Sequence, residues 1–349
     1  MVGHDGNPAL IRFRRHSLCN PTAAFLFFAD TTDMLSRVAE SVYWMSRQVE
    51  RAENIARFLE VTLNLILDQP ENLVDPWSPL VQVTADEEWF EEKYGKPDSR
   101  NVVQFLAFDD EYPNSMVSCL RAARENARGV RETLSSEAFE QLNEFYHFVG
   151  DASPAAAMDP TSQFFDAVRK QTLLWSGVFA STMAQDSGWH FANLGRMLER
   201  ADKTSRILDV KYFNLLPNLA DVGTAVDDLQ WSALLLAISG IEAYRRDHHQ
   251  IEIEKVVDFF LFNRSFPRSI HHCIASANWS LGEIEEASSS DMARTAGPIL
   301  DELQHRLAHT QVEEALAGGM HQFVDSVQTE INRIGEALGQ DYFQISVNT

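Results

Sequence analysis

The sequence predicts an all-α protein made of two tandemly duplicated helical-bundle halves of about 150 residues each. Three observations predict this fold. Apolar residues recur at helical spacing along most of the chain. Only 16 glycines and 12 prolines interrupt 349 residues, and the Asn-Gly pair typical of a tight β-hairpin is absent. Finally, the segment RQVERAENIARFLEV at 47–61 recurs in similar form as RMLERADKTSRILDV at 196–210.

A second internal match is longer, because residues 77–120 align without a gap on residues 231–274. The identical pairs include Trp77 and Trp231, Pro113 and Pro267, Ser115 and Ser269, and Cys119 and Cys273. Both matches occur in the same order, so we infer an ancient tandem duplication. The Ala- and Pro-rich stretch 151–160 is typical of a linker. The sequence therefore divides into an N-terminal extension over 1–33, a first repeat over 34–155 and a second repeat over 156–349.

The first predicted helix spans 34–67 and carries apolar residues such as Met45, Val49 and Leu59 on one side. Similar periodicity predicts helices within 116–149, 162–185, 189–213, 228–247, 294–314 and 317–339. Pro113 and Pro267 each stand two residues before a serine, which is typical of a helix start. The short apolar run 102–108 fits a strand by itself, but helix signals flank both of its copies, so we expect helix there too.

Residues 1–33 differ from the rest of the chain. Three arginines precede a short apolar run at 23–29, which loosely imitates a signal peptide. However, no small-residue cleavage site follows, and periodic sequence begins only at Met34. We therefore expect 1–33 to be a poorly ordered extension with little role in the fold.

The charge and the cysteines narrow the class of protein. A formal net charge of −22 argues against a general binder of the nucleic-acid backbone. No apolar run reaches the roughly 18 residues of a membrane span, so no membrane contact is expected. Cys19, Cys119 and Cys273 lie far apart without zinc-site spacing. This pattern is typical of reduced, buried thiols in a cytoplasmic protein.

The two copies of the first match carry charged side chains on one face of a predicted helix, nearly opposite the apolar residues. The first copy contributes Arg47, Glu50, Glu53 and Arg57, and the second contributes Arg196, Glu199, Asp202 and Arg206. Arginine is kept at three matched pairs, which are 47 and 196, 51 and 200, and 57 and 206. A need for planar guanidinium groups explains this better than a need for charge alone.

Three interpretations of this charged face are open. In the first interpretation, the face is solvated, and its salt bridges between residues one helical turn apart stabilise the helix by only about 0.2–0.5 kcal/mol each. Alternatively, it is a buried Glu/Arg network that fixes how helices dock. In the third interpretation, the two copies line a ligand site across a pseudo-two-fold cleft.

A separate arginine stripe occurs in the first half only. Its members, spaced by three or four residues on a predicted helix, are Arg121, Arg124, Arg128 and Arg131. The matching segment 274–284 of the second half has no arginine. Guanidinium groups in this arrangement suit a carboxylate or phosphate ligand. The alternative is that they are exposed or paired with nearby acidic residues.

Di-metal helical proteins use one Glu from each of two helices and a Glu-x-x-His from two others. The residues of that type here are Glu50, Glu199, Glu144 with His147, and Glu302 with His305. Arginines flank both single glutamates and would compete with a metal ion, so no metal is expected. No nucleotide-loop, zinc-protease or serine-hydrolase motif is present, so no cofactor or catalytic nucleophile is predicted.

Several segments resemble the bacterial alpha-E domain proteins. They are MLSRVAESVYWMSRQVERAENIARFLEV, NSMVSCLRAARENARGVRETLSSE, GWHFANLGRMLERADKTSRILDVKY, QWSALLLAISGIEAYRR and FPRSIHHC. The resemblance covers roughly residues 34–345. Its motif positions here are Arg47, Glu50, Arg51, Glu53, Arg196, Glu199, Arg200 and Asp202, with Arg121, Glu125, Asn126 and Arg128 from the second segment.

The resemblance implies an all-helical cytoplasmic protein associated with a circularly permuted ATP-grasp ligase and often with a transglutaminase-like protease. We therefore expect a non-catalytic partner or substrate-presenting subunit of an amide-bond-forming system, with a peptide or an amino acid as candidate ligand. One alternative is an enzyme that uses Glu50 and Glu199 for acid/base chemistry. A second alternative is a di-metal carboxylate protein.

Overall fold

The computed structural model describes residues 31–68, 76–214, 225–288 and 294–343. All regular structure in these ranges is helical, and they contain no strand. This confirms the predicted all-α class. Of the expected extension over 1–33, residues 1–30 lie outside the described part, and helix α1 begins at Thr31.

The first group of helices covers residues 31–182 and begins with the long helix α1. They are α1 (Thr31–Asp68), α2 (Ser78–Gln82), α3 (Glu87–Tyr94), α4 (Ser99–Val103), the π-helix η1 (Gln104–Phe108), α5 (Met116–Gly129), α6 (Ser136–Met158) and α7 (Ser162–Thr182). The run 102–108 is thus helical, as expected from its flanks. The predicted helix 116–149 is two helices, because a turn follows Gly129.

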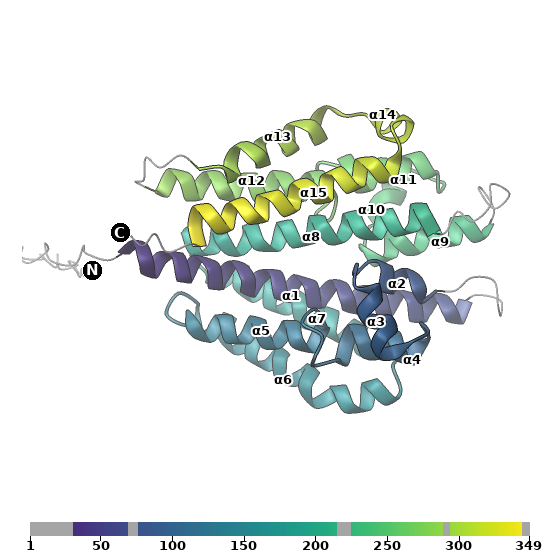
Figure 1. The fold of residues 1–349 in the computed structure, drawn as a ribbon, viewed down its shortest axis with the longest axis horizontal. Helices are drawn as coiled ribbons and strands as arrows, with labels where there is room; N and C mark the ends of the chain where they lie inside the picture. Colours follow the sequence, from purple (N-terminus) through teal and green to yellow (C-terminus); the bar gives the residue numbers. More distant parts are fainter. Residues whose placement is uncertain (1–30, 69–75, 215–224, 289–293, 344–349) are drawn as a thin grey trace, which may run out of the picture.

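The remaining helices begin with α8, which contains the second copy. They are α8 (Ser187–Asn214), α9 (Ala225–Ala237), α10 (Ile241–Asp247), α11 (Ile253–Phe262), α12 (Ile270–Ala287), α13 (Ala296–His309), α14 (Val312–Ala317), α15 (Met320–Leu338) and the π-helix η2 (Gly339–Phe343). Helices α1 and α8 lie side by side at the centre, with α5 to α7 on one side and α12 to α15 on the other (Figure 1).

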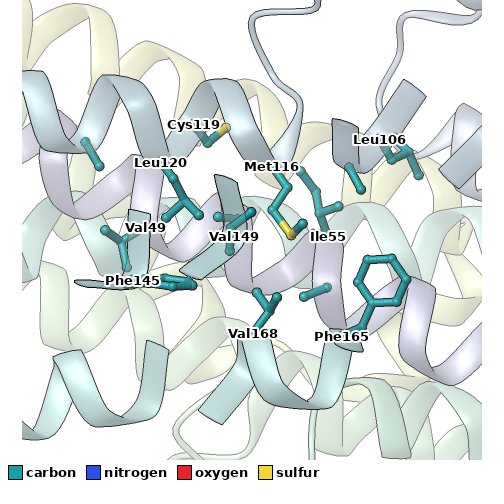
Figure 2. Packing of buried hydrophobic residues seen from close by; sticks show 14 of the residues in the cluster. Val49, Ile55, Leu106, Met116, Cys119, Leu120, Phe145, Val149, Phe165 and Val168 are labelled. Carbon is teal, nitrogen blue, oxygen red and sulfur yellow. The ribbon is translucent and has the colours of Figure 1, made fainter. Parts of the chain in front are cut away.

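The first hydrophobic core lies between α1, α5, α6 and α7. Figure 2 shows Val49 of α1, Leu120 of α5, Phe145 of α6 and Val168 of α7 converging on one another. Each of these side chains is at most 1% exposed. Burial of a side chain of this size stabilises the fold by about 1.5–3 kcal/mol. The spacing of apolar residues on α1 therefore determines which of its sides meets α5 and α7.

The second core lies between α8, α9, α11 to α13 and α15. The two cores meet along α1 and α8, because each of these helices serves both. Tyr43 of α1 packs into the second core, whereas Trp189 of α8 packs into the first. The central helix pair therefore holds the two cores together.

The chain stays helical through Met158, so most of the stretch expected to be a linker is part of α6. Helix α7, which follows the expected boundary near 155, packs against α6 and α1 in the first core. The boundary itself stays a prediction from the sequence.

Corresponding positions of the two sequence matches have corresponding local structure. Ser115 begins α5 and accepts a hydrogen bond from the backbone N–H of Ser118, while Ser269 begins α12 and accepts from that of His272, each at 3.2 Å. Ala85, after α2, and Ser239, after α9, have φ values of 61° and 55°. They are the non-glycine residues with positive φ in the described ranges. These similarities agree with a duplication, which stays an inference from the sequence.

Candidate functional site: a buried Glu/Arg network between two helices

The two copies of the charged segment face each other in the structure. They lie on α1 and α8, which run in the same direction along the centre of the molecule (Figure 1). Gly195 of α8 permits their close approach, because a Cβ atom there would overlap the backbone oxygen of Tyr43. The close packing brings polar side chains of both helices out of solvent.

Reciprocal ion pairs join the two helices. Arg51 Nε and Nη2 donate to the two carboxylate oxygens of Glu199 at 2.7 and 3.0 Å. Arg200 Nε and Nη2 donate to the two carboxylate oxygens of Glu50 at 2.9 and 2.7 Å. The arginine of each Glu-Arg dipeptide therefore binds the glutamate of the other dipeptide. Both pairs have the two-pronged geometry that distinguishes arginine from lysine.

Both glutamates are buried, with side-chain exposure of 2% for Glu50 and 0% for Glu199. Glu199 receives a second arginine, since Arg47 Nε donates to it at 2.9 Å and Arg47 Nη1 donates to the Tyr43 hydroxyl at 3.0 Å. The charged face is therefore not solvated. A buried carboxylate requires this kind of compensation, because loss of its hydration is costly.

Glu50 also receives a second arginine, Arg268, from the turn before α12. Arg268 donates to Glu50 at 3.0 Å and to Glu53 at 2.6 Å. Our candidate site residues did not include Arg268. A signal for it exists in the second sequence match, where it stands between Pro267 and Ser269. The matched residue in the first copy is Asn114, whose side-chain oxygen accepts a hydrogen bond from Arg51.

The remaining matched arginines bind on their own helix or beside it. Arg57 donates to Glu53 at 2.8 Å, and Arg206 donates to Asp202 at 2.9 Å, each one turn back. Arg196 donates to Asn193 at 2.8 Å. Of the ten predicted network residues, five join α1 to α8 directly, and they are Arg47, Glu50, Arg51, Glu199 and Arg200. The other five bind on their own helix or to residues before α12 and after α9.

The ion pairs set the protonation of the glutamates. Burial alone would raise the pKa of Glu50, but the charges of Arg200 and Arg268 outweigh burial and lower this pKa to about 2. Burial likewise opposes ionisation of Glu199, yet Arg51 and Arg47 hold its pKa well below the usual range. A general acid or base works best with a pKa near the working pH. Both carboxylates instead stay ionised and fully occupied at neutral pH, which disfavours acid/base catalysis by them.

Burial dominates the pKa of two other arginines of the network and of two nearby cysteines. Burial and the neighbouring charge of Arg268 lower the pKa of Arg57 to about 10, and burial with Arg200 lowers that of Arg196 to about 10. Burial raises the pKa of Cys119 and of Cys273 to about 12. Both thiols are free and buried, and they stay protonated, which makes them poor nucleophiles.

Three arginines of the stripe lie on α5, and Arg131 lies in the turn that follows this helix. Arg124 donates to Asn143 at 2.7 Å, and its guanidinium lies 4.9 Å from the ring centre of Tyr146. Arg128 pairs with Glu125 at 3.1 Å. In addition, Arg131 lies over the ring of Phe139, and Arg121 is exposed beside Tyr146. The stripe therefore has aromatic and acidic neighbours within the chain, and Arg121 is the member without a hydrogen bond, ion pair or cation–π contact among the described residues.

The residues of the di-metal alternative do not come together. Glu50 and Glu199 are held by arginines, whereas Glu144, His147, Glu302 and His305 are exposed on α6 and α13. Within the described ranges, no group of three or more His, Cys, Asp or Glu side chains is arranged to hold a metal ion. None of the helices in those ranges combines the length and apolarity that a membrane crossing needs.

Comparison with known proteins adds a family. Residues 34–343 match the Alpha-E family, described as a predicted alpha-helical domain with a conserved ER motif. The chain has two Glu-Arg dipeptides, Glu50-Arg51 and Glu199-Arg200, and these four residues form the reciprocal ion pairs.

The similar curated proteins are uncharacterised proteins from Mycobacterium bovis and from two strains of Mycobacterium tuberculosis. Each is 24% identical over 298 residues, which covers 80% of this chain and 33% of the relative. The chain thus spans about a third of the length of these relatives. No solved structure matches it. The match over residues 34–343 and the paired Glu-Arg dipeptides show that this chain belongs to the Alpha-E family.

Proposed function

We propose that this chain is a non-catalytic helical partner of an amide-bond-forming ligase of the ATP-grasp class. It binds the ligase or presents a peptide or an amino acid to it. The burial and pairing of Glu50 and Glu199 support a role without catalysis. Each carboxylate is buried and bound by two arginines, so neither has a free oxygen or a pKa suited to proton transfer.

The length of the relatives supports a partner role. Two thirds of each relative lies outside the match, so there the region similar to this chain is joined to further sequence in one polypeptide. Because the similar region is part of a longer polypeptide in these relatives, we infer that it associates with separate partner proteins here. The ATP-grasp class of that partner, a transglutaminase-like protease as a second partner, and a cytoplasmic location all come from the family resemblance.

The charge of the chain gives this proposal a further physical element. A net charge of −22 attracts a basic surface and speeds encounter with it at low salt. Association with the ligase should therefore weaken as the salt concentration rises.

Co-purification is the direct test. A tagged chain is captured with the ATP-grasp ligase of the same organism, with and without ATP, at low and moderate salt. We expect retention of the ligase that decreases with salt. Failure to retain the ligase under every condition would reject the partner role.

Reconstitution separates the partner role from catalysis. The amide-forming reaction is measured with the wild type, with Glu50→Gln and with the exposed control Glu144→Gln. A partner role predicts that Glu50→Gln lowers activity only in proportion to its folded fraction, measured by circular dichroism. A fully folded Glu50→Gln protein without activity would favour the enzyme alternative.

A further inference from the structure

A pocket of about 210 Å³ opens beside the network, between α1, α8, the turn after α2 and Asn332 of α15. Its cationic lining residues are Arg47, Arg51, Lys203 and Arg206, and its acidic one is Asp202. Another part of the lining is apolar, with Phe58, Leu80 and Val83 among its residues. A positive pocket with an apolar wall is unexpected in a chain with a net charge of −22.

Donors in this pocket remain unused by the chain. Arg206 donates from Nε to the two Asp202 oxygens at 2.9 and 3.0 Å. Its Nη1 and Nη2 groups have no partner among the described residues, and the side chain is 22% exposed. Lys203 contacts Asp202 at 3.1 Å and Glu199 at 3.8 Å, and it also lines the pocket. Asp202 thus serves two cations, Lys203 and Arg206.

The arginine that the sequence alignment matches to Arg206 is Arg57, and it has no such free donors. Arg57 binds Glu53 through Nε and Nη2, and its Nη1 donates to the Ser239 hydroxyl at 2.6 Å. The residue matched to Ser239 is Ala85, whose methyl group cannot accept a hydrogen bond.

The residue before the serine that begins α5 or α12 also differs between the two matched segments, being Asn114 in the first and Arg268 in the second. Arg268 extends to Glu50 and Glu53 and is buried, so the chain itself completes the network on its side. Its match Asn114 is shorter and lies in the wall of the pocket. On the side of Arg57 the chain's own side chains take up the arginine donors, whereas on the side of Arg206 they leave Nη1 and Nη2 without a partner among the described residues.

We propose that this pocket binds the carboxylate of a small ligand with an apolar side chain, such as an amino acid or the C-terminus of a short peptide. The two Nη groups of Arg206 present parallel N–H donors that match a carboxylate, and Lys203 adds charge. The apolar wall receives the side chain. The volume of about 210 Å³ lies below the roughly 300–1,000 Å³ of pockets that hold drug-sized ligands, which suits a ligand of this size.

This inference deepens the proposed function, because it gives the presented substrate a place. The role of the bound molecule as a ligase substrate rests on the proposed function, whereas carboxylate binding rests on the pocket alone. The test therefore uses the isolated chain, and its outcome is independent of co-purification with the ligase.

The probe is N-acetyl-L-leucine, titrated into the full chain and followed by calorimetry and by the shift in melting temperature. N-acetyl-L-leucinamide is the matched probe without the charge, and inorganic phosphate is the anion without the apolar group. We expect N-acetyl-L-leucine to bind at least about tenfold more tightly than either. Equal binding of the amide, or binding of phosphate alone, would overturn the proposal.

Arg206→Gln should weaken N-acetyl-L-leucine binding by about tenfold or more, because it removes the free donors. The exposed control Arg333→Gln makes the same change of charge outside the pocket and should bind like the wild type. If Arg206→Gln does not fold, Lys203→Gln provides the same comparison. Unchanged binding in a folded pocket variant, or no binding of N-acetyl-L-leucine to the wild type, would also reject the site.

Discussion

Arg51 of α1 binds Glu199 of α8 through two hydrogen bonds, and Arg200 of α8 binds Glu50 of α1 in the same way. The two Glu-Arg dipeptides therefore hold each other across the helix pair. This relationship gives the repeated dipeptide a structural role, in which each copy satisfies a buried charge of the other.

Removal of one carboxylate should destabilise the protein strongly. Glu50→Gln leaves Arg200 without its buried counter-charge and leaves Arg268 with Glu53 alone, and breaking a buried ion pair in this way costs about 3–5 kcal/mol. The free energy of unfolding from urea denaturation measures it. Glu144→Gln, on an exposed side chain, should change it by less than about 0.5 kcal/mol. Similar values for the two variants would speak against a buried network.

The difference in unfolding free energy between the wild type and Glu50→Gln should depend on pH. The folded-state pKa of Glu50 is lowered to about 2, below its unfolded value of about 4.3. Its contribution is therefore fully present above the unfolded pKa and is lost as the pH falls toward 2. Wild type should exceed Glu50→Gln in unfolding free energy at pH 7, and the difference should narrow toward pH 3. A constant difference across that range would contradict the role of ionised Glu50.

The close approach of α1 and α8 should tolerate no side chain at Gly195. Gly195→Ala places a methyl group against the backbone oxygen of Tyr43, and overpacking of this kind costs about 1–3 kcal/mol. Gly177, on α7, has open space around its Cβ position. Gly177→Ala should stabilise by about 0.5–1 kcal/mol through helix propensity. Thermal unfolding measures both, and a harmless Gly195→Ala would mean that the helices are not this close.

Ala85 should benefit from glycine. Its φ of 61° lies in the left-handed region, which costs an L residue roughly 1–2 kcal/mol. Ala85→Gly should therefore stabilise the fold by up to about 1 kcal/mol after the entropy cost of glycine. Ser239→Gly should gain less, because it also removes the hydroxyl that accepts from Arg57. Denaturant midpoints compare the two, and a larger gain for Ser239→Gly would be inconsistent with that hydrogen bond.

The sequence predicts much of the fold and part of the site. Periodicity locates the long helices, and the repeat identifies the charged positions, because both are local patterns. Periodicity predicts which side of a helix is polar but does not predict which other helix that side contacts. The pairing of Arg51 with Glu199 depends on how α1 docks on α8, and Arg268 reaches Glu50 from a turn far away in the chain. The same limit applies to α7, which follows the expected boundary yet packs on α1.

A double-mutant cycle on Arg51 and Glu199 tests the central claim most directly. Unfolding free energies are measured for Arg51→Met, Glu199→Gln and the double variant, all at pH 7. A direct buried ion pair predicts that the double variant loses less than the sum of the two single losses, with a coupling energy of about 2 kcal/mol. Additive losses, within about 0.5 kcal/mol, would contradict the claim that the two Glu-Arg dipeptides bind each other.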